Sequence, residues 1–278
     1  MQTDVSFSNV QQEVLPYNTI NKVINDDSIL KLLNLDSVDK VNNINIYRRA
    51  FVHKSYCTRK NENFLEGNVN CPKDCLPLQE ESNERLEFLG DSVLNLVIAS
   101  YAFERYPNVN EGFLTNIRTK LVNGNMLARL SKEIGLNNYL IISHQIELND
   151  GRNNKNILED VFESFIGAIY LDFEEQNKSG FDYAKQWVIQ IIEENVDFTE
   201  LMNTNVNYKD KFVKYCQHNL QYIPTFFQTN VTEHNGKKIH TVCVKNNNGV
   251  TIGVGKGFTK KEAEIDAAKK GLEYFGNI

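Results

Sequence analysis

Three acids inside an apolar segment constrain this chain more than any other feature. Residues 83–97 contain Glu84, Glu87 and Asp91 among mostly apolar neighbours. Because these acids are three and four residues apart, a helix would carry all of them on one face. Carboxylates that close repel one another, so a folded helix needs a positive charge beside them. Hard oxygen ligands favour Mg²⁺ or Mn²⁺, and the segment therefore predicts a metal-binding helix.

A second acidic segment follows about seventy residues later. Within residues 156–170, Asp160 and Glu163 are three residues apart on a strongly apolar stretch. Asn156 with Glu159 is typical of a capped helix start. Two such helices can cross so that acids from both meet at a shared metal ion. We expect a metal-dependent hydrolase site rather than a nucleophile triad.

The two acidic segments, and the motifs between them, resemble those of the ribonuclease III family. The string Asn83–Leu94 resembles the family signature, and Asp160-x-x-Glu163 before Gly-Ala-Ile-Tyr-Leu-Asp resembles the family's second acidic helix. Further matches in order and spacing are Phe51–Tyr56, Asn110-Glu111-Gly112 and Arg118-x-Lys120-Leu121-Val122-Asn123. The resemblance covers roughly residues 25–195.

This resemblance implies an endoribonuclease that hydrolyses double-stranded RNA with a water activated by Mg²⁺, for which Mn²⁺ can substitute. No organic cofactor is expected. By resemblance the inner metal ligands are Glu87, Asp91, Asp160 and Glu163, while Glu84 and Glu111 act in the outer sphere or on a second ion. Ordinary solvated helix faces are the alternative, which is disfavoured because all six acids match family positions.

The resemblance also implies a homodimer in which each protomer cuts one strand, leaving 5′-phosphates and short 3′ overhangs. Phe88 occupies the family position that inserts into the partner subunit, and a plain core phenylalanine is the alternative. With one catalytic domain in the chain, the second site comes from a second copy. His53 and Ser55 match a family helix, but we expect a hydrogen-bonded, structural histidine there rather than a catalytic one.

The pattern of the chain predicts a tail followed by two domains. Residues 1–19 are polar and unpatterned. Residues 20–198 show helical periodicity without β-alternation, which predicts an all-α RNase III endonuclease domain with a polar loop over 145–156. Residues of about 57–82, rich in Asn, Glu, Cys and Pro, resemble an insertion into that domain.

Residues 206–278 change to an α-β-β-β-α pattern. A helix over 208–220 precedes three alternating segments, 226–231, 240–244 and 251–256, with turns at 235–236 and 246–249. Thr259-x-x-Glu262 is a capping box that opens a final helix to Tyr274. The order resembles a double-stranded-RNA-binding domain, so the fold class is multi-domain.

The basic residues of this segment are the candidate RNA contacts. Lys260 and Lys261 lie at a helix N-terminus, where backbone N–H groups and the helix dipole favour phosphate. A-form RNA is recognised mainly by shape, through phosphates and 2′-hydroxyls. Val213 and the short turn after His234 depart from the family pattern and predict weaker minor-groove contacts. Gln217 is a candidate contact to a 2′-hydroxyl. The remaining candidates, for each of which a solvated basic face is the alternative, are Lys214, Lys237, Lys238 and Lys256.

The charge of the chain is unevenly divided. The net charge is −6, but from Val206 onward 11 Lys and no Arg face 6 acids, giving +5, and the preceding part carries −11. An acidic body with a basic module fits a metal site joined to a polyanion-binding domain. No apolar run is long enough to span a bilayer and no signal pattern opens the chain. We expect an intracellular, cytoplasm-like location and no membrane partner.

Five cysteines without a secretion signal predict reduced thiols. Cys57, Cys71 and Cys75 cluster in or beside the insertion. Free thiols are favoured there over a zinc site completed by His53, because no second close pair of Cys or His residues supplies the remaining ligands.

Two other functions compete with cleavage. A non-cleaving double-stranded-RNA-binding protein would sequester or remodel duplexes, and a structural protein would use only the dimer surface. The carboxylates discriminate against the first, because a protein that only binds RNA gains nothing from six acids that repel phosphate. The second leaves both the acids and the lysines at the start of the last helix unexplained.

Overall fold

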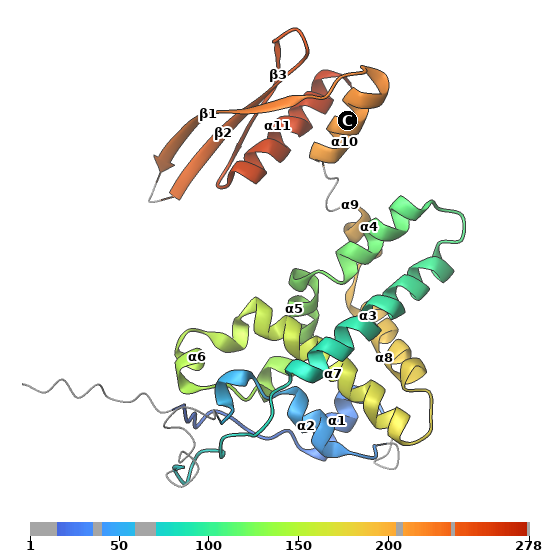
Figure 1. The fold of residues 1–278 in the computed structure, drawn as a ribbon, viewed down its shortest axis with the longest axis vertical. Helices are drawn as coiled ribbons and strands as arrows, with labels where there is room; N and C mark the ends of the chain where they lie inside the picture. Colours follow the sequence, from blue (N-terminus) through green and yellow to red (C-terminus); the bar gives the residue numbers. More distant parts are fainter. Residues whose placement is uncertain (1–15, 36–40, 59–70, 204–207, 235–236, 277–278) are drawn as a thin grey trace, which may run out of the picture. The chain divides into compact units, whose positions relative to one another are not determined.

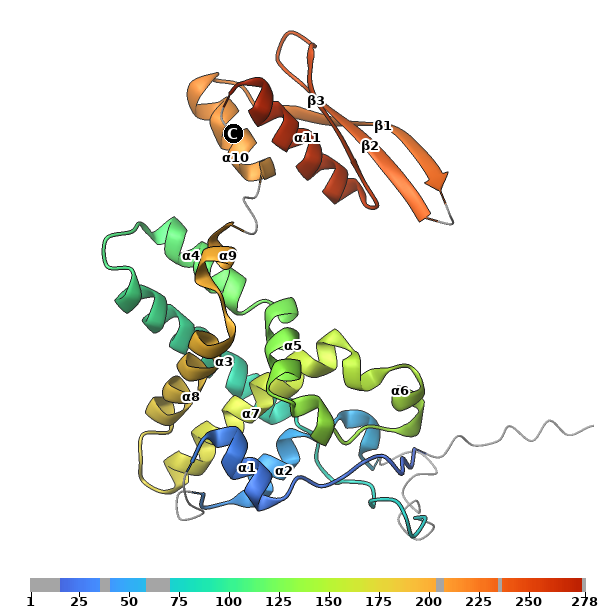
Figure 2. The same ribbon diagram turned by 180° about the vertical axis from the view of Figure 1, so that it is seen from behind.

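The computed structural model describes residues 16–35, 41–58, 71–203, 208–234 and 237–276. The chain divides into two compact units between Val196 and Asp197, each of which has its own core (Figures 1 and 2). The first unit is helical and the second contains a three-stranded sheet, which confirms the predicted fold class.

The first unit is built from eight described α-helices and three short 3₁₀ turns. The helices are α1 (Asp26–Leu33), α2 (Ile44–Ala50), α3 (Glu84–Arg105), α4 (Glu111–Leu121), α5 (Gly124–Glu133), α6 (His144–Leu148), α7 (Lys155–Glu175) and α8 (Gly180–Asn195). The 3₁₀ turns are η2 (Lys54–Tyr56), η4 (Leu136–Tyr139) and η5 (Gly151–Asn153). Two isolated β-bridges, Val52 with Ile141 and Cys57 with Gln79, tie the connecting segments together.

Helix α7 is the central element of the first unit. Every residue from Val161 to Ile169 is buried, because α2, α3, α5 and α8 all pack against this helix. Phe165 packs against Tyr47 of α2 and Trp187 of α8, and the hydroxyl of Ser164 donates to the Ala50 carbonyl at 2.7 Å. A helix that is apolar on most of its surface is stable only in such a position.

Among the described residues, only helix α3 is long and apolar enough to cross a membrane. Of its most apolar 18-residue stretch, however, 44% is buried inside the first unit. It packs along α7 (Figures 1 and 2), and its buried residues include Leu86, Leu94 and Ile98. A core helix of this kind meets the same length and composition criteria as a membrane helix.

The start of the described chain is part of the fold. Tyr17 and Asn18 are buried, although the polar tail was expected to extend to residue 19. The Asn18 side-chain amide donates to the Ile142 carbonyl at 3.2 Å and to Glu147 at 2.8 Å. Residues 1–15 of the predicted tail lie outside the described residues.

Local capping explains where the helices differ from the sequence prediction. The predicted loop over 145–156 contains α6 and η5. Helix α7 begins at Lys155, because the Asn154 side chain accepts the backbone N–H groups of residues 156 and 157, so the predicted Asn156 cap is wrong. Asn123 caps α5 in the same way, and α4 and α5 are therefore separate helices.

The second unit consists of α9 (Phe198–Asn203), α10 (Tyr208–Asn219), β1 (Thr225–His234), β2 (Lys237–Lys245), β3 (Thr251–Gly257) and α11 (Lys260–Tyr274). The strands form an antiparallel sheet in the order β1-β2-β3, and α10 and α11 pack around Phe212, Val244 and Ala267. The Thr259 capping box is present as predicted. The strands are longer than predicted, since their outer ends lack strict alternation, and the predicted turn at 235–236 lies outside the described residues.

Candidate functional site

Helix α3 presents Glu84, Glu87 and Asp91 within its first three turns. The helix start is fixed by the Asn83 N–H, which donates to the Val52 carbonyl at 2.8 Å. Glu84 and Asp91 are exposed and Glu87 is half-buried, while Leu86 and Gly90 on the other side of the helix are buried. The spacing of three and four residues thus places the acids on one face, as predicted.

A close crossing of α3 and α7 brings the second pair of acids to that face. Gly90 lies so near α7 that a Cβ at this position would be 1.7 Å from the Glu163 carbonyl oxygen. A Cβ at Gly167 would be 2.3 Å from the Leu86 carbonyl oxygen. The two backbones therefore touch directly at the level of Asp91 and Glu163.

The electrostatics show that the acids of both helices share one environment. Burial, together with the charges of Asp91, Glu159 and Glu87, raises the pKa of Glu163 to about 8. Burial, together with the charges of Glu87 and Glu159, likewise raises the pKa of Asp160 to about 7. Burial raises the pKa of Glu87 as well. Charges on α3 therefore act on the acids of α7, so the carboxylates of the two helices lie within electrostatic reach of one another.

The donor set fits a hard divalent cation in its chemistry. The candidate ligands on α3 and α7 are all carboxylates, which suit Mg²⁺ or Mn²⁺ better than softer metals. In the part of the chain that the structure describes, no three His, Cys, Asp or Glu side chains are placed to hold a metal ion as they stand. Neighbouring carboxylates repel one another, so a cation held by them would have to offset that repulsion.

The sixth predicted acid, Glu111, comes from a different helix. It is exposed at the first residue of α4, and the Asn110 side chain caps that helix by accepting the Phe113 N–H at 2.9 Å. The Glu111 carboxylate accepts a hydrogen bond from the Thr115 hydroxyl at 2.7 Å. The charges that raise the pKa values of Asp160 and Glu163 come from acids of α3 and α7, and the role of Glu111 stays a prediction.

Comparison with known proteins gives the family. The family described as Ribonuclease-III-like matches residues 43–195, and the Double-stranded RNA binding motif matches residues 208–275. The chain belongs to the ribonuclease III family. The predicted membership is therefore confirmed, and the family consists of endoribonucleases that act on double-stranded RNA.

Several relatives in the ribonuclease III family match most of the chain. Ribonuclease 3 of Borreliella burgdorferi is 35% identical over 237 residues, which are 85% of this chain and 87% of that protein. Probable ribonuclease 3 of Acanthamoeba polyphaga mimivirus is 34% identical over 84% of this chain, which spans only 42% of that relative. A solved nuclease domain of ribonuclease III from Campylobacter jejuni is 30% identical, with a TM-score of 0.48, and covers 62% of this chain and 99% of its own.

The double-stranded RNA binding motif carries the predicted basic residues on its surface. Lys260 and Lys261 are the first two residues of α11 and are exposed. The Glu262 carboxylate accepts the backbone N–H groups of Phe258 and Thr259, at 2.8 and 3.3 Å, and so lowers the positive potential of that helix start. Lys237 lies over the Phe258 ring at 5.7 Å, beside the same helix start. The other candidates, all exposed, are Lys214 and Gln217 on α10, Lys238 on β2 and Lys256 on β3.

Two charged residues beside the acids of α3 and α7 were not among the candidates predicted from the sequence. Lys54 pairs with Glu84 through Nζ and Oε1 at 2.9 Å. Glu159 adds its charge to Asp160 and Glu163. A Cβ on Gly124, at the start of α5, would lie 2.0 Å from Glu159 Oε2, so this side chain lies against α5 and does not cap α7. In the sequence, the local indication that the Lys54 side chain points outward is its position between His53 and Ser55.

The histidine of this motif is hydrogen-bonded, as predicted. His53 Nδ1 lies 2.8 Å from the Ser55 hydroxyl oxygen, and the Ser55 hydroxyl oxygen accepts the Ser143 N–H at 3.0 Å. Burial lowers the pKa of His53. The Ser55 hydroxyl thus links His53 to the backbone at Ser143, while the charge of nearby Glu84 also acts on His53.

The cysteines of the insertion are free thiols. Cys57, Cys71 and Cys75 are half-buried beside Tyr17 and Tyr56. No set of three metal-ligating side chains is found in the described residues, and the zinc alternative therefore gains no support there. Residues 59–70 of the insertion lie outside the described part.

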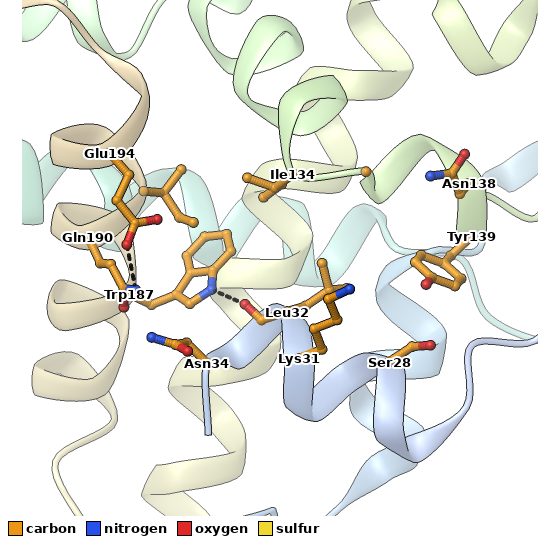
Figure 3. Close-up of a pocket in the computed structure, with 12 residues that line it drawn as sticks. Ser28, Lys31, Leu32, Asn34, Ile134, Asn138, Tyr139, Trp187, Gln190 and Glu194 are labelled. Carbon is orange, nitrogen blue, oxygen red and sulfur yellow. Dashed lines mark hydrogen bonds between the residues drawn. The ribbon is translucent and has the colours of Figure 1, made fainter. Parts of the chain in front are cut away.

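A pocket in the first unit lies apart from the acids (Figure 3). It is lined by residues of α1, η4 and α8 and by Ile134 and Gly135 after the end of α5, and none of the predicted site residues lines it. The Trp187 indole N–H donates to the Leu32 carbonyl at 2.7 Å, and the Gln190 amide donates to Glu194 at 2.8 Å. The Trp187 bond joins α8 to α1 and the Gln190 bond lies within α8, so the pocket borders a contact between the two helices.

Proposed function

We propose that the chain is a Mg²⁺-dependent endoribonuclease that cleaves double-stranded RNA. The observation that carries the proposal is the crossing of α3 and α7 at Gly90 and Gly167, which gathers acids from both helices on one face. A protein that only bound RNA would gain nothing from repelling carboxylates in this position. The match of residues 208–275 to the Double-stranded RNA binding motif supports duplex RNA as the substrate.

The residues of the chain divide the work of phosphodiester hydrolysis. Glu87, Asp91, Asp160 and Glu163 would hold the divalent ion, and Glu84 and Glu111 would act in the outer sphere or on a second ion. When bound, the ion supplies an activated water and neutralises charge on the phosphate. Glu163 is buried on the packed helix α7, which would limit the freedom of its side chain around a bound ion.

The basic residues of the second unit would hold the duplex. Lys260 and Lys261 at the start of α11, together with Lys237, Lys238 and Lys256, would contact phosphates. Lys214 and Gln217 of α10 would face the minor groove. Such contacts recognise the shape of A-form RNA and carry little sequence information.

The purified chain is expected to cut a long RNA duplex in Mg²⁺ or Mn²⁺ and to bind the duplex without cutting it in Ca²⁺. The products should carry 5′-phosphates and short 3′ overhangs, which sequencing of the RNA ends would reveal. Single-stranded RNA of the same sequence is the matched control. Tight duplex binding without cleavage in either Mg²⁺ or Mn²⁺ would instead identify a non-cleaving RNA-binding protein.

The exposed face of α3 supports the proposal of a homodimer. Phe88 is 78% exposed, Leu96 58% and Phe103 71%, and these residues follow one another at helical spacing. The alternative that Phe88 is a core residue is therefore wrong. Large apolar side chains in a row on the surface are typical of a protein interface. A second copy of the chain would cover them and supply the site for the opposite RNA strand.

Replacing Phe88 by aspartate is expected to weaken the dimer at least tenfold, because a charge would then have to be buried at the interface. Sedimentation equilibrium at several protein concentrations would measure the change. Leu148→Asp is the matched control, since Leu148 is also exposed but lies on α6, away from α3. A parent protein that is monomeric at high concentration, or an F88D dimer of unchanged strength, would contradict the proposal.

A further inference from the structure

Lys54 stands at the edge of the acidic face on a rigid support. It begins η2, and its neighbours on both sides are fixed: the His53 N–H donates to the Ile141 carbonyl at 3.0 Å, and the Ser55 hydroxyl oxygen accepts the Ser143 N–H. Tyr56, which follows, is fully buried. Because these neighbours point into the fold, the Lys54 side chain is directed outward.

The outward direction brings the ammonium group of Lys54 to the acids. Its Nζ lies 2.9 Å from Glu84 Oε1, and its charge also acts on Asp160 and Glu87. Lys54 is therefore a cation whose field reaches acids of both α3 and α7. The acids do not bury the Lys54 side chain, which is 65% exposed to solvent.

An exposed ion pair of this kind is easily exchanged. Both side chains stay in contact with water, and such pairs contribute little to the stability of a protein. A phosphate oxygen of an approaching RNA strand offers the ammonium group an equivalent partner with a full negative charge. The polyanion also needs such a contact, because the face it must approach carries several carboxylates.

We propose that Lys54 binds a backbone phosphate of the RNA at the edge of the acidic site, exchanging Glu84 for the substrate. This assignment rests on the proposed function and adds a substrate-binding residue of the first unit to it. The ammonium group offsets the repulsion between carboxylates and phosphate at the point where the strand enters. Lys54 would thus contribute to RNA binding and not to metal binding.

Loss of the Lys54 charge is expected to weaken RNA binding but not metal binding. A positive charge near the carboxylates repels a divalent cation, so its removal leaves cation binding unchanged or strengthens it. A residue that merely held the acids in place would behave differently, because its loss would weaken metal binding and RNA binding together.

The test compares the full-length parent with Lys54→Met and Lys54→Arg, and uses Lys132→Met as control because Lys132 is exposed on α5. Duplex RNA affinity is measured in Ca²⁺ at several salt concentrations, and Mn²⁺ affinity is measured without RNA by calorimetry. We expect K54M to bind the duplex roughly three- to tenfold more weakly, with a salt slope smaller by about one phosphate contact. Its Mn²⁺ affinity should be equal to or higher than that of the parent. K54R should restore RNA binding, and K132M should match the parent.

Unchanged duplex affinity and salt slope in K54M would overturn the proposal. A parallel loss of Mn²⁺ affinity would also overturn it, since it would show a structural role. Cleavage by the parent in Mg²⁺ is scored separately and decides only the proposed function. Because the RNA affinity is read in Ca²⁺ without cleavage, the two proposals fail by different measurements.

Discussion

Replacing Glu163 by glutamine is expected to abolish cleavage and to stabilise the metal-free protein at high pH. Glutamine has the same shape, but it lacks the charge that a divalent cation needs. Cleavage should fall by roughly 10²–10³-fold or more, as for other groups that stabilise charge in a transition state. Glu163 is only 8% exposed and lies among other acids, so the same charge is unfavourable in the folded protein without a cation.

The direction of the pH effect follows from the raised pKa. Glu163 ionises at about pH 8 in the folded protein, against an ordinary value of 4.5. Between these values the folded state binds a proton that the unfolded state has lost, so the free energy of unfolding falls as the pH rises through this window. One such group contributes at most about 1.4 kcal/mol per pH unit. E163Q lacks this slope, and its stability advantage should therefore grow from pH 5 to pH 8.

Thermal unfolding at pH 6 and pH 9, with and without Mg²⁺, measures this effect. Mg²⁺ should stabilise the parent at pH 9 and leave E163Q almost unchanged. Glu194→Gln is the matched control, because Glu194 is exposed on α8 and should show neither effect. RNA binding in Ca²⁺ should be retained by E163Q. Equal losses of RNA binding, folding and cleavage would show that Glu163 is structural.

The acidic face could be predicted from the sequence because its determinants are local. Glu84, Glu87 and Asp91 lie within three turns of one helix, and the helical period alone decides their direction. The same holds for Asp160 and Glu163. The family motifs then added the information that the two helices meet, which spacing alone does not contain.

Lys54 and Glu159 could not be assigned in this way. Lys54 reaches Glu84 across thirty positions that include the insertion, so their contact depends on the bond between Asn83 and Val52 that sets the start of α3. Glu159 fits a capping pattern in the sequence, but Asn154 caps the helix instead. Its direction depends on Gly124 of α5, a contact between distant segments.

The role of Gly90 and Gly167, where α3 and α7 cross, also depends on a contact between distant segments. Gly90 stands inside a helix, where glycine lowers stability relative to alanine by roughly 0.5–1 kcal/mol. Sequence reasoning alone gives no reason for that loss. The structure gives one, since only a residue without a Cβ allows the backbones of α3 and α7 to touch. The contact between α3 and α7, which also brings the acids to one face, thus outweighs the low helix propensity of glycine.

Gly90→Ala is accordingly expected to be among the most damaging small substitutions in the chain. Its Cβ would lie 1.7 Å from the Glu163 carbonyl oxygen and 2.9 Å from the Gly167 nitrogen, and backbone atoms of a buried helix cannot rotate away. The helices would have to separate, which lowers the free energy of unfolding by about 3 kcal/mol or more. The separation would also move Asp91 away from Glu163, so any folded fraction should bind Mn²⁺ more weakly.

Gly112→Ala is the matched control for this variant. Gly112 also lies in a helix, α4, but the nearest atom to an added Cβ is Asn110 Oδ1 at an ordinary 3.6 Å. Its replacement should raise the free energy of unfolding by roughly 0.5–1 kcal/mol, because alanine is the better helix former. Urea unfolding of both variants measures the two opposite shifts, and calorimetry measures Mn²⁺ binding. A G90A protein as stable as the parent and equally able to bind Mn²⁺ would show that the crossing does not hold the acids together.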